Sequence, residues 1–235
     1  MITIIGSAHV LDIAERVKKE IKLRNPEIVA VELDKNRYIA LRSGETDTRG
    51  LPLTYRLLAY LQRTIAEKFG VTVGGEMLAA VDAAQEIGAG VAFIDIPSDR
   101  VFQRLMTRMS LKEKMYLVVG MIVGLFTSKE KIEEEVENYQ SGGGGNHMIT
   151  VEEKLPTIAE VLIDERNEYM ARNLLKLQEK FGSVVAVVGD GHLPGLIKEI
   201  GYDSVDVVRL KDLRSPEKYS NGDVSYSFSY TIEKD

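Results

Sequence analysis

The sequence predicts an α/β fold with a mixed, mostly parallel central sheet flanked by helices. Short runs of apolar, largely β-branched residues recur along the chain, and most are separated by segments with helical character. Such runs are typical of strands that are buried on both faces. Strands joined by helices favour parallel pairing. The expected strands are residues 2–5, 28–33, 91–94, 184–188 and 205–210.

Helices are expected between the strands in the first half of the chain. Asp12 suits the N-cap of the first helix, and Asn25-Pro26 ends it. Gly74-Gly75-Glu76-Met77 opens the last helix of this half. The expected helices are residues 12–23, 35–41, 54–69 and 79–87.

The second half predicts a helical insertion at about residues 98–180, within a single domain that spans residues 1–235. A helix near residues 194–200 separates the last two expected parallel strands. Near the C-terminus, apolar residues alternate with Ser and Thr over residues 224–232, and Asn221-Gly222 is expected to form a turn before them. This period of two predicts a late antiparallel edge strand.

Residues 141–148, Ser-Gly-Gly-Gly-Gly-Asn-His-Met, resemble an engineered linker that replaces a native segment. A flexible hinge between helices is the natural alternative. We therefore exclude His147 from the candidate site.

Composition indicates a soluble, globular protein that we expect to be cytoplasmic. The chain has 44% hydrophobic and 28% charged residues, no cysteine, and a first strand that begins at residue 2. A net charge of −6 argues against nucleic acid as a partner. The apolar residues 115–126 are fewer than the roughly 18 needed to span a bilayer. They suit a buried or homo-oligomer-interface helix, with a lid or membrane-surface contact as the alternative.

Two histidines follow expected strands in the same way. His9 lies in Gly6-Ser7-Ala8-His9, and His192 lies in Gly189-Asp190-Gly191-His192. Ligands of open α/β sheets bind at the carboxyl ends of strands, so both histidines are candidates for one site. Each motif alone is common by chance, but two at equivalent places favour a function.

Acidic residues are expected at the same edge of the sheet, where the carboxyl ends of the strands lie and which we call the rim. Glu32 and Asp95 follow strands, and Glu76 lies at a helix start, although helix capping would also explain any of the three. Two imidazoles with one or two carboxylates suit a divalent transition metal. The same groups without metal would perform general acid–base chemistry.

The segment Asp164-Glu165-Arg166 lies in an expected helix whose face would close over the rim. Arg166 would then clamp an anionic group or hold a ligand carboxylate. An ordinary ion pair on the helix surface is the alternative for Glu165 and Arg166.

Together these segments resemble the TraB family, which includes the pheromone-shutdown protein PrgY and the Tiki proteases. The stretches that carry the resemblance cover most of the chain in the family's order. They are GSAHV (6–10), VELDKNRY (31–38), GGEM (74–77), Asp95-x-Pro97 with Arg104, DERNEYMA (164–171) and VVGDGHLPG (187–195). The resemblance implies a single site with His9 and His192 as metal ligands, and full-length relatives that are often membrane-attached.

We therefore expect a divalent-metal-dependent hydrolase that acts on a peptide or another small substrate. His9, His192 and either Glu32 or Glu76 would hold Mn²⁺, Co²⁺ or Zn²⁺, and the remaining carboxylate would accept a proton from water. Glu165, Arg166 and Arg104 would complete the catalytic set, with the arginines binding substrate or stabilising negative charge. One alternative is a non-catalytic module that binds a peptide or small ligand. The other is a metal-free hydrolase with His9 as the base.

Overall fold

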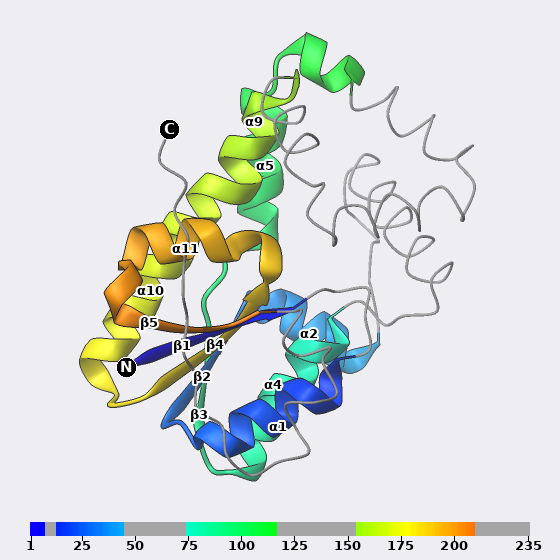
Figure 1. The fold of residues 1–235 in the computed structure, drawn as a ribbon. Helices are drawn as coiled ribbons and strands as arrows, with labels where there is room; N and C mark the ends of the chain where they lie inside the picture. Colours follow the sequence, from blue (N-terminus) through cyan, green and yellow to red (C-terminus); the bar gives the residue numbers. More distant parts are fainter. Residues whose placement is uncertain (8–12, 45–73, 117–153, 210–235) are drawn as a thin grey trace, which may run out of the picture.

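A computed structural model describes residues 1–7, 13–44, 74–116 and 154–209. Within these ranges five strands form one sheet in the order β3-β2-β4-β1-β5, and every pair is parallel. The predicted α/β fold with a mostly parallel sheet is therefore confirmed (Figure 1). The strands are β1 (Ile2–Ser7), β2 (Ile28–Val31), β3 (Gly90–Phe93), β4 (Val184–Gly189) and β5 (Val205–Val208).

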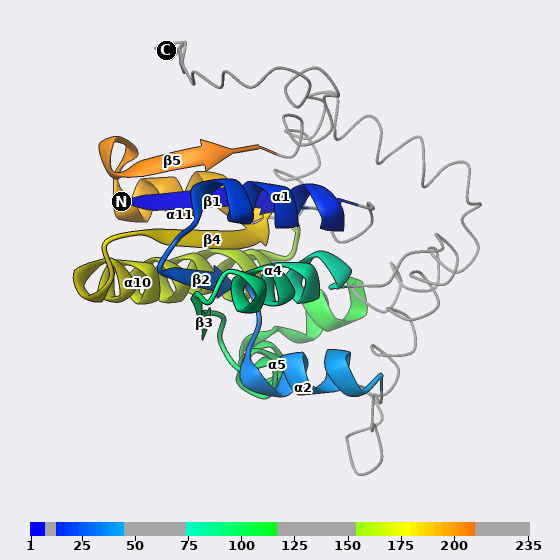
Figure 2. The same cartoon turned by 90° about the horizontal axis from the view of Figure 1, so that it is seen from below.

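Helices cover both faces of the sheet (Figures 1 and 2). On one face lie α1 (Ala14–Arg24) and α4 (Gly75–Glu86), and on the other lie α10 (Glu165–Lys180) and α11 (Leu193–Ile200). The connecting helices are α2 (Lys35–Ser43), α5 (Ser98–Arg108), α9 (Pro156–Ala159), the π-helix Glu160–Asp164 and the 3₁₀ turns Asp190–His192 and Tyr202–Ser204.

The strand β4 is apolar along its length because both of its faces are covered. In β4, Val185 and Val187 pack with α1 and α4, whereas Val184, Ala186 and Val188 pack with α10 and α11. All five residues are at most 2% exposed. This two-sided burial explains why the runs read as continuous apolar segments rather than as an alternation.

Four of the described candidates, Glu32, Asp95, Arg166 and His192, lie together at the carboxyl rim of the sheet because of how the helices connect to the strands. The helices α4 and α10 lead into the starts of β3 and β4, so their own first turns lie at the opposite end, beside the ends of the strands. The helix α11 also begins there, since it follows β4 after one 3₁₀ turn. Strand ends and helix starts therefore share one rim.

Several element boundaries differ from those predicted. The strand β2 ends at Val31 rather than residue 33, which leaves Glu32 in the following segment, and β5 ends at Val208. The helix α4 begins at Gly75, four residues before the predicted start, because Gly74 adopts φ 81° and opens the helix directly. Glu76 consequently lies in the first turn of α4.

Other predicted features lie outside the described residues. They are Asp12, the helix at residues 54–69, the linker at 141–148, most of the apolar segment 115–126 and the edge strand at 224–232. The extent of the single domain stays a prediction. Among the described residues, no helix has both the length and the hydropathy that crossing a membrane requires.

A buried carboxylate joins the helical residues 111–116 to the start of α9. Glu113 is 6% exposed and accepts hydrogen bonds from the backbone N and Oγ of Ser110, both at 2.8 Å. It also accepts from the backbone N of Thr157 at 2.9 Å and from its hydroxyl at 3.2 Å. Burial opposes the charged form, but these four donors outweigh it and lower the pKa of Glu113 from 4.5 to about 2.

Replacing this carboxylate should change how stability depends on pH. A depressed folded-state pKa stabilises the fold above pH 4.5, and this contribution is lost as the pH falls towards 2. We expect Glu113→Gln to lower the free energy of unfolding by about 1–2 kcal/mol near pH 7. Urea denaturation of both proteins from pH 7 to pH 2.5 would show the difference shrinking on acidification. A difference that stays constant with pH would contradict this role.

Candidate functional site

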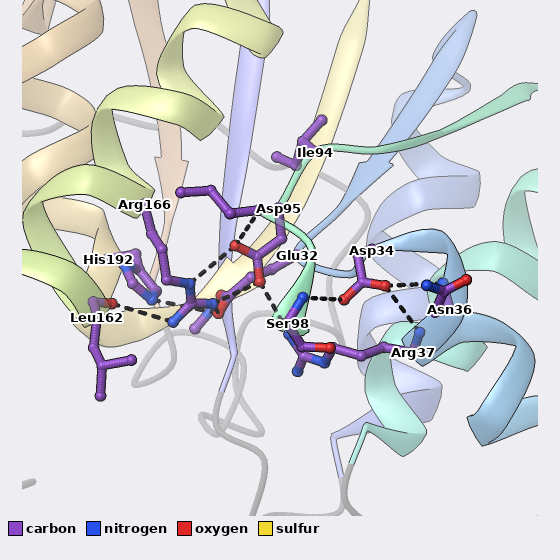
Figure 3. A network of polar contacts seen from close by, with 12 residues as sticks. Glu32, Asp34, Asn36, Arg37, Ile94, Asp95, Ser98, Leu162, Arg166 and His192 are labelled. Atoms are coloured by element: carbon purple, nitrogen blue, oxygen red, sulfur yellow. Dashed lines mark hydrogen bonds and ion pairs between the residues drawn. The ribbon is translucent and has the colours of Figure 1, made fainter. Parts of the chain in front are cut away.

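Glu32 is the residue on which the rim contacts converge. It follows β2 directly, is 3% exposed, and its backbone N donates to the Val187 carbonyl at 3.0 Å. Its Oε2 accepts from the backbone N of Gly189 at 2.6 Å. Its Oε1 pairs with the guanidinium of Arg166 and lies 3.3 Å from Nε2 of His192 (Figure 3). The end of β2 is thereby tied to the end of β4 and the start of α10.

His192 is held from both sides of its ring. The 3₁₀ turn after β4 places it just before α11, where it is buried. Its Nδ1 lies 2.7 Å from Oδ1 of Asn167 on α10, and its Nε2 faces Oε1 of Glu32. An amide oxygen and a carboxylate oxygen both accept hydrogen bonds. In this arrangement each ring nitrogen therefore faces an acceptor oxygen, and Nε2 is the nitrogen that lies beside the carboxylate.

Arg166 connects the two buried carboxylates of the rim. Its Nε and Nη2 bind Oδ1 and Oδ2 of Asp95 at 2.9 and 2.8 Å, and Nη2 also contacts Glu32. Its Nη1 donates to the carbonyl of Leu162, within the π-helix, at 3.2 Å. A two-pronged guanidinium–carboxylate pair fixes orientation as well as charge. These hydrogen bonds therefore fix the orientation of the Arg166 guanidinium at the rim.

Arg37 completes this network from α2. Its Nη1 lies 2.9 Å from Oδ2 of Asp95, so the two arginines approach Asp95 from two sides (Figure 3). Asp34 caps α2 by accepting from the backbone N of Asn36 and Arg37 at 2.8 and 3.1 Å, and it also accepts from Ser98 N at 3.2 Å. Asp34, rather than Asp95, thus binds the start of α5.

The electrostatics favour the charged forms of Glu32 and Arg166. Burial opposes the charged form of Glu32, but His192, Arg166 and Gly189 N outweigh it and lower its pKa. Burial likewise opposes the charge on Arg166, yet Asp95 and Glu32 raise its pKa. The network contains two carboxylates and two guanidiniums, equal numbers of groups of opposite charge. A carboxylate with so low a pKa is a weak proton acceptor, which bears on the role of Glu32.

Two of the predicted residues pair with each other. Glu165 binds Arg104 and Arg108 of α5. Burial opposes its charge, but the two guanidiniums outweigh that effect and lower its pKa. Glu165 and Arg166 are neighbours on α10, yet their side chains go to different partners.

The other acidic candidate, Glu76, is 3% exposed in the first turn of α4. That helix covers the face of the sheet opposite to α10 and α11. Candidate residues on helices therefore come from both faces of the sheet, Glu76 from α4 on one face and Arg166 from α10 on the other.

The two Gly-x-x-His motifs leave adjacent strands at the same level. Ser7 of β1 lies opposite Gly189 of β4 in the parallel register. A Cβ added to Gly6 would lie 2.4 Å from Oδ1 of Asp190, so this glycine allows one motif to approach the other closely. His9 itself lies outside the described residues, and its proximity to His192 stays a prediction.

The donor set for a metal ion is partly present. Within the described ranges, no group of three His, Asp or Glu side chains is arranged to hold a metal ion. Two donors, Nε2 of His192 and Oε1 of Glu32, do converge. Further ligands would have to come from elsewhere, and the sequence offers His9.

Asn167, Arg37 and Asp34 were not identified as site residues from the sequence. Asp34 carries a recognisable signal, an acidic residue directly before a helix. Asn167 stands next to Arg166 in a stretch that resembles the TraB family, but nothing in the local pattern connects it with a histidine 25 residues away.

Comparisons with known proteins agree with the sequence resemblance. An uncharacterized protein of Methanocaldococcus jannaschii is 34% identical, over 98% of this chain and 62% of its own length. A TraB domain-containing protein of Bos taurus is 25% identical, over 83% of this chain and 61% of its own. The chain thus spans about three fifths of these relatives.

One solved structure that aligns with the chain is that of ChaN of Campylobacter jejuni, whose title is "Cofacial heme binding to ChaN of Campylobacter jejuni". The alignment has a TM-score of 0.40 and 12% sequence identity, and it covers 95% of this chain and 83% of ChaN. The model of the TraB/PrgY/gumN family matches residues 1–202. The chain therefore belongs to the TraB/PrgY/gumN family.

Proposed function

We propose that this protein is a hydrolase of peptide bonds whose site is centred on His192 and Glu32. The observation that carries the proposal is the imidazole held between Oδ1 of Asn167 and Oε1 of Glu32 at the carboxyl rim. An imidazole oriented in this way is suited to transferring protons. The rim is also where open α/β sheets bind their ligands.

The contacts at the rim support a different role for each of His192, Glu32 and Glu76. With Nδ1–H bound to Asn167, Nε2 of His192 is the nitrogen that can accept a proton or bind a ligand. Glu32 is held ionised by Arg166 and Gly189 N, so it suits orienting and charge-stabilising roles better than that of a base. Of the two glutamates, Glu76 is therefore the candidate proton acceptor.

A divalent ion such as Mn²⁺, Co²⁺ or Zn²⁺ would be held by His192 and Glu32 together with His9. Such an ion lowers the pKa of a water molecule so that hydroxide forms near neutral pH. The contact of Asn167 with Nδ1 supports this assignment, since metal-binding histidines usually bind a polar partner through their other nitrogen. Arg166 then balances the second carboxylate, Asp95.

A non-catalytic peptide-binding module is the second candidate. Its supporting observation is that the buried carboxylates are already paired with arginines, while the Arg37 side chain is 36% exposed at the edge of the network. An exposed guanidinium can bind a peptide carboxylate without cleavage.

The two candidates predict different results from one set of assays. We expect protein purified without chelating resin to contain a divalent metal, and to cleave members of a peptide library when Mn²⁺, Co²⁺ or Zn²⁺ is supplied. EDTA should stop the cleavage. His192→Ala should lack it, and His147→Ala is the matched histidine control. Cleavage that persists in EDTA would favour the metal-free hydrolase. Peptide binding that needs His192 but leads to no cleavage would favour the binding module.

A further inference from the structure

We propose that Asn167 is a positioning residue that fixes the tautomer of His192, with the proton on Nδ1 and Nε2 directed at Glu32. The inference rests on the proposed function only in treating Nε2 as the nitrogen that acts. The tautomer itself can be measured without any substrate.

The first support is the contact between Asn167 and His192. Asn167 is 4% exposed in the first turn of α10, and its Oδ1 lies 2.7 Å from Nδ1 of His192. An amide oxygen can only accept, so Nδ1 must be the donor. A neutral imidazole carries one N–H, which this contact places on Nδ1, so Nε2, 3.3 Å from Oε1 of Glu32, is the nitrogen that takes up a further proton or a cation.

The second support is a glycine that makes room for the amide. A Cβ added to Gly195 would lie 2.0 Å from Nδ2 of Asn167 and 2.7 Å from its Cγ. Gly195 lies inside α11, where alanine would ordinarily favour the helix more than glycine does. The absence of a side chain at Gly195 therefore has a specific use, since it lets α11 pack against Asn167.

Because Glu32 lies beside Nε2, the tautomer of His192 decides what that nitrogen can do. If Nε2 carried the only proton, the ring would donate to Glu32 and present a lone pair to Asn167. With the proton on Nδ1, Nε2 is instead left to take up a proton or a cation beside an ionised carboxylate. The sense of the Asn167 hydrogen bond thus decides which nitrogen of His192 is available.

Ring ¹⁵N chemical shifts of histidine-labelled protein would test this directly. The chain has three histidines, and His192→Ala identifies the relevant signals. At a pH where the ring is neutral, and in EDTA, we expect wild type and Asn167→Asp to show the Nδ1–H form. Asp keeps an acceptor oxygen in place. Asn167→Leu, which has no acceptor, should shift the population towards Nε2–H, and Gly195→Ala should do so in part.

Two results would overturn the inference: an Nε2–H form in the wild type, or the same tautomer in wild type and Asn167→Leu. Far-UV circular dichroism checks folding, and Gly195→Ala preserves the test if the Leu variant does not fold, since it should also shift the tautomer. Where cleavage is observed, Asn167→Leu should lower kcat by about 10- to 100-fold, with KM nearly unchanged. If no cleavage is found but the tautomer shifts as expected, only the hydrolase proposal fails. If cleavage is found but the tautomer does not shift, only the positioning role fails.

Discussion

Arg166→Leu should lower the free energy of unfolding by about 3–5 kcal/mol, measured by urea denaturation at pH 7. Arg166 is the guanidinium that binds both buried carboxylates, Glu32 and Asp95, which are 3% and 4% exposed. Removing it would leave Asp95 with Arg37 and Glu32 with His192 as the remaining charged or chargeable partners. An incompletely paired buried charge costs far more than an exposed pair contributes.

Matched variants separate this effect from the loss of any arginine. Arg104 pairs with Glu165, but its side chain is 42% exposed, so Arg104→Leu should cost no more than about 1 kcal/mol. Arg166→Lys should fall between the two, because an ammonium cannot form the two-pronged contact. A loss in Arg166→Leu no greater than that in Arg104→Leu would refute the central role of Arg166.

The loss of unfolding free energy in Arg166→Leu should depend on pH. The folded-state pKa of Glu32 is lowered, so its ionisation stabilises the fold above its ordinary pKa and ceases to do so on acidification. Without Arg166 this carboxylate would lose one of the groups that lower its pKa. The deficit of Arg166→Leu should therefore be largest near pH 7 and shrink as the pH falls.

The strands were predictable because their signal is local. Residues 184–188 read as a doubly buried strand from composition alone, and the structure buries every one of them. Glu32 and Asp95 lie just after β2 and β3, as expected for residues that follow parallel strands, whose carboxyl ends share one edge. The sequence therefore predicted where these side chains lie in the fold better than which contacts they make.

The contacts depend on directions that the sequence does not specify. Glu165 and Arg166 are adjacent, and both were predicted for the site, but neighbouring side chains on a helix point about 100° apart. Accordingly Arg166 reaches Glu32 and Asp95, whereas Glu165 reaches α5. The partner of His192 was missed for a related reason, since Asn167 meets it only because α10 packs against α11.

The largest expected effect on activity is that of His192→Ala, which should reduce peptide cleavage by about 10²- to 10⁴-fold. The ring lies between Asn167 and Glu32, so its removal takes away the nitrogen proposed to handle the proton or the metal. His192 is not among the apolar residues of the core, so we expect the fold to persist. His147→Ala, treated identically, should retain wild-type cleavage.

Glu32→Gln and Glu76→Gln should then lose activity for different reasons. The lowered pKa of Glu32 makes it a poor base, so we expect Glu32→Gln to reduce the metal content of the purified protein along with the rate. Glu76→Gln should keep the metal and lose the rate, because a carboxamide cannot accept the proton. Metal analysis and peptide cleavage on the same preparations decide between the roles. If Glu76→Gln loses the metal while Glu32→Gln keeps it, the two assignments must be exchanged, because the residue that holds the ion is then the one on α4.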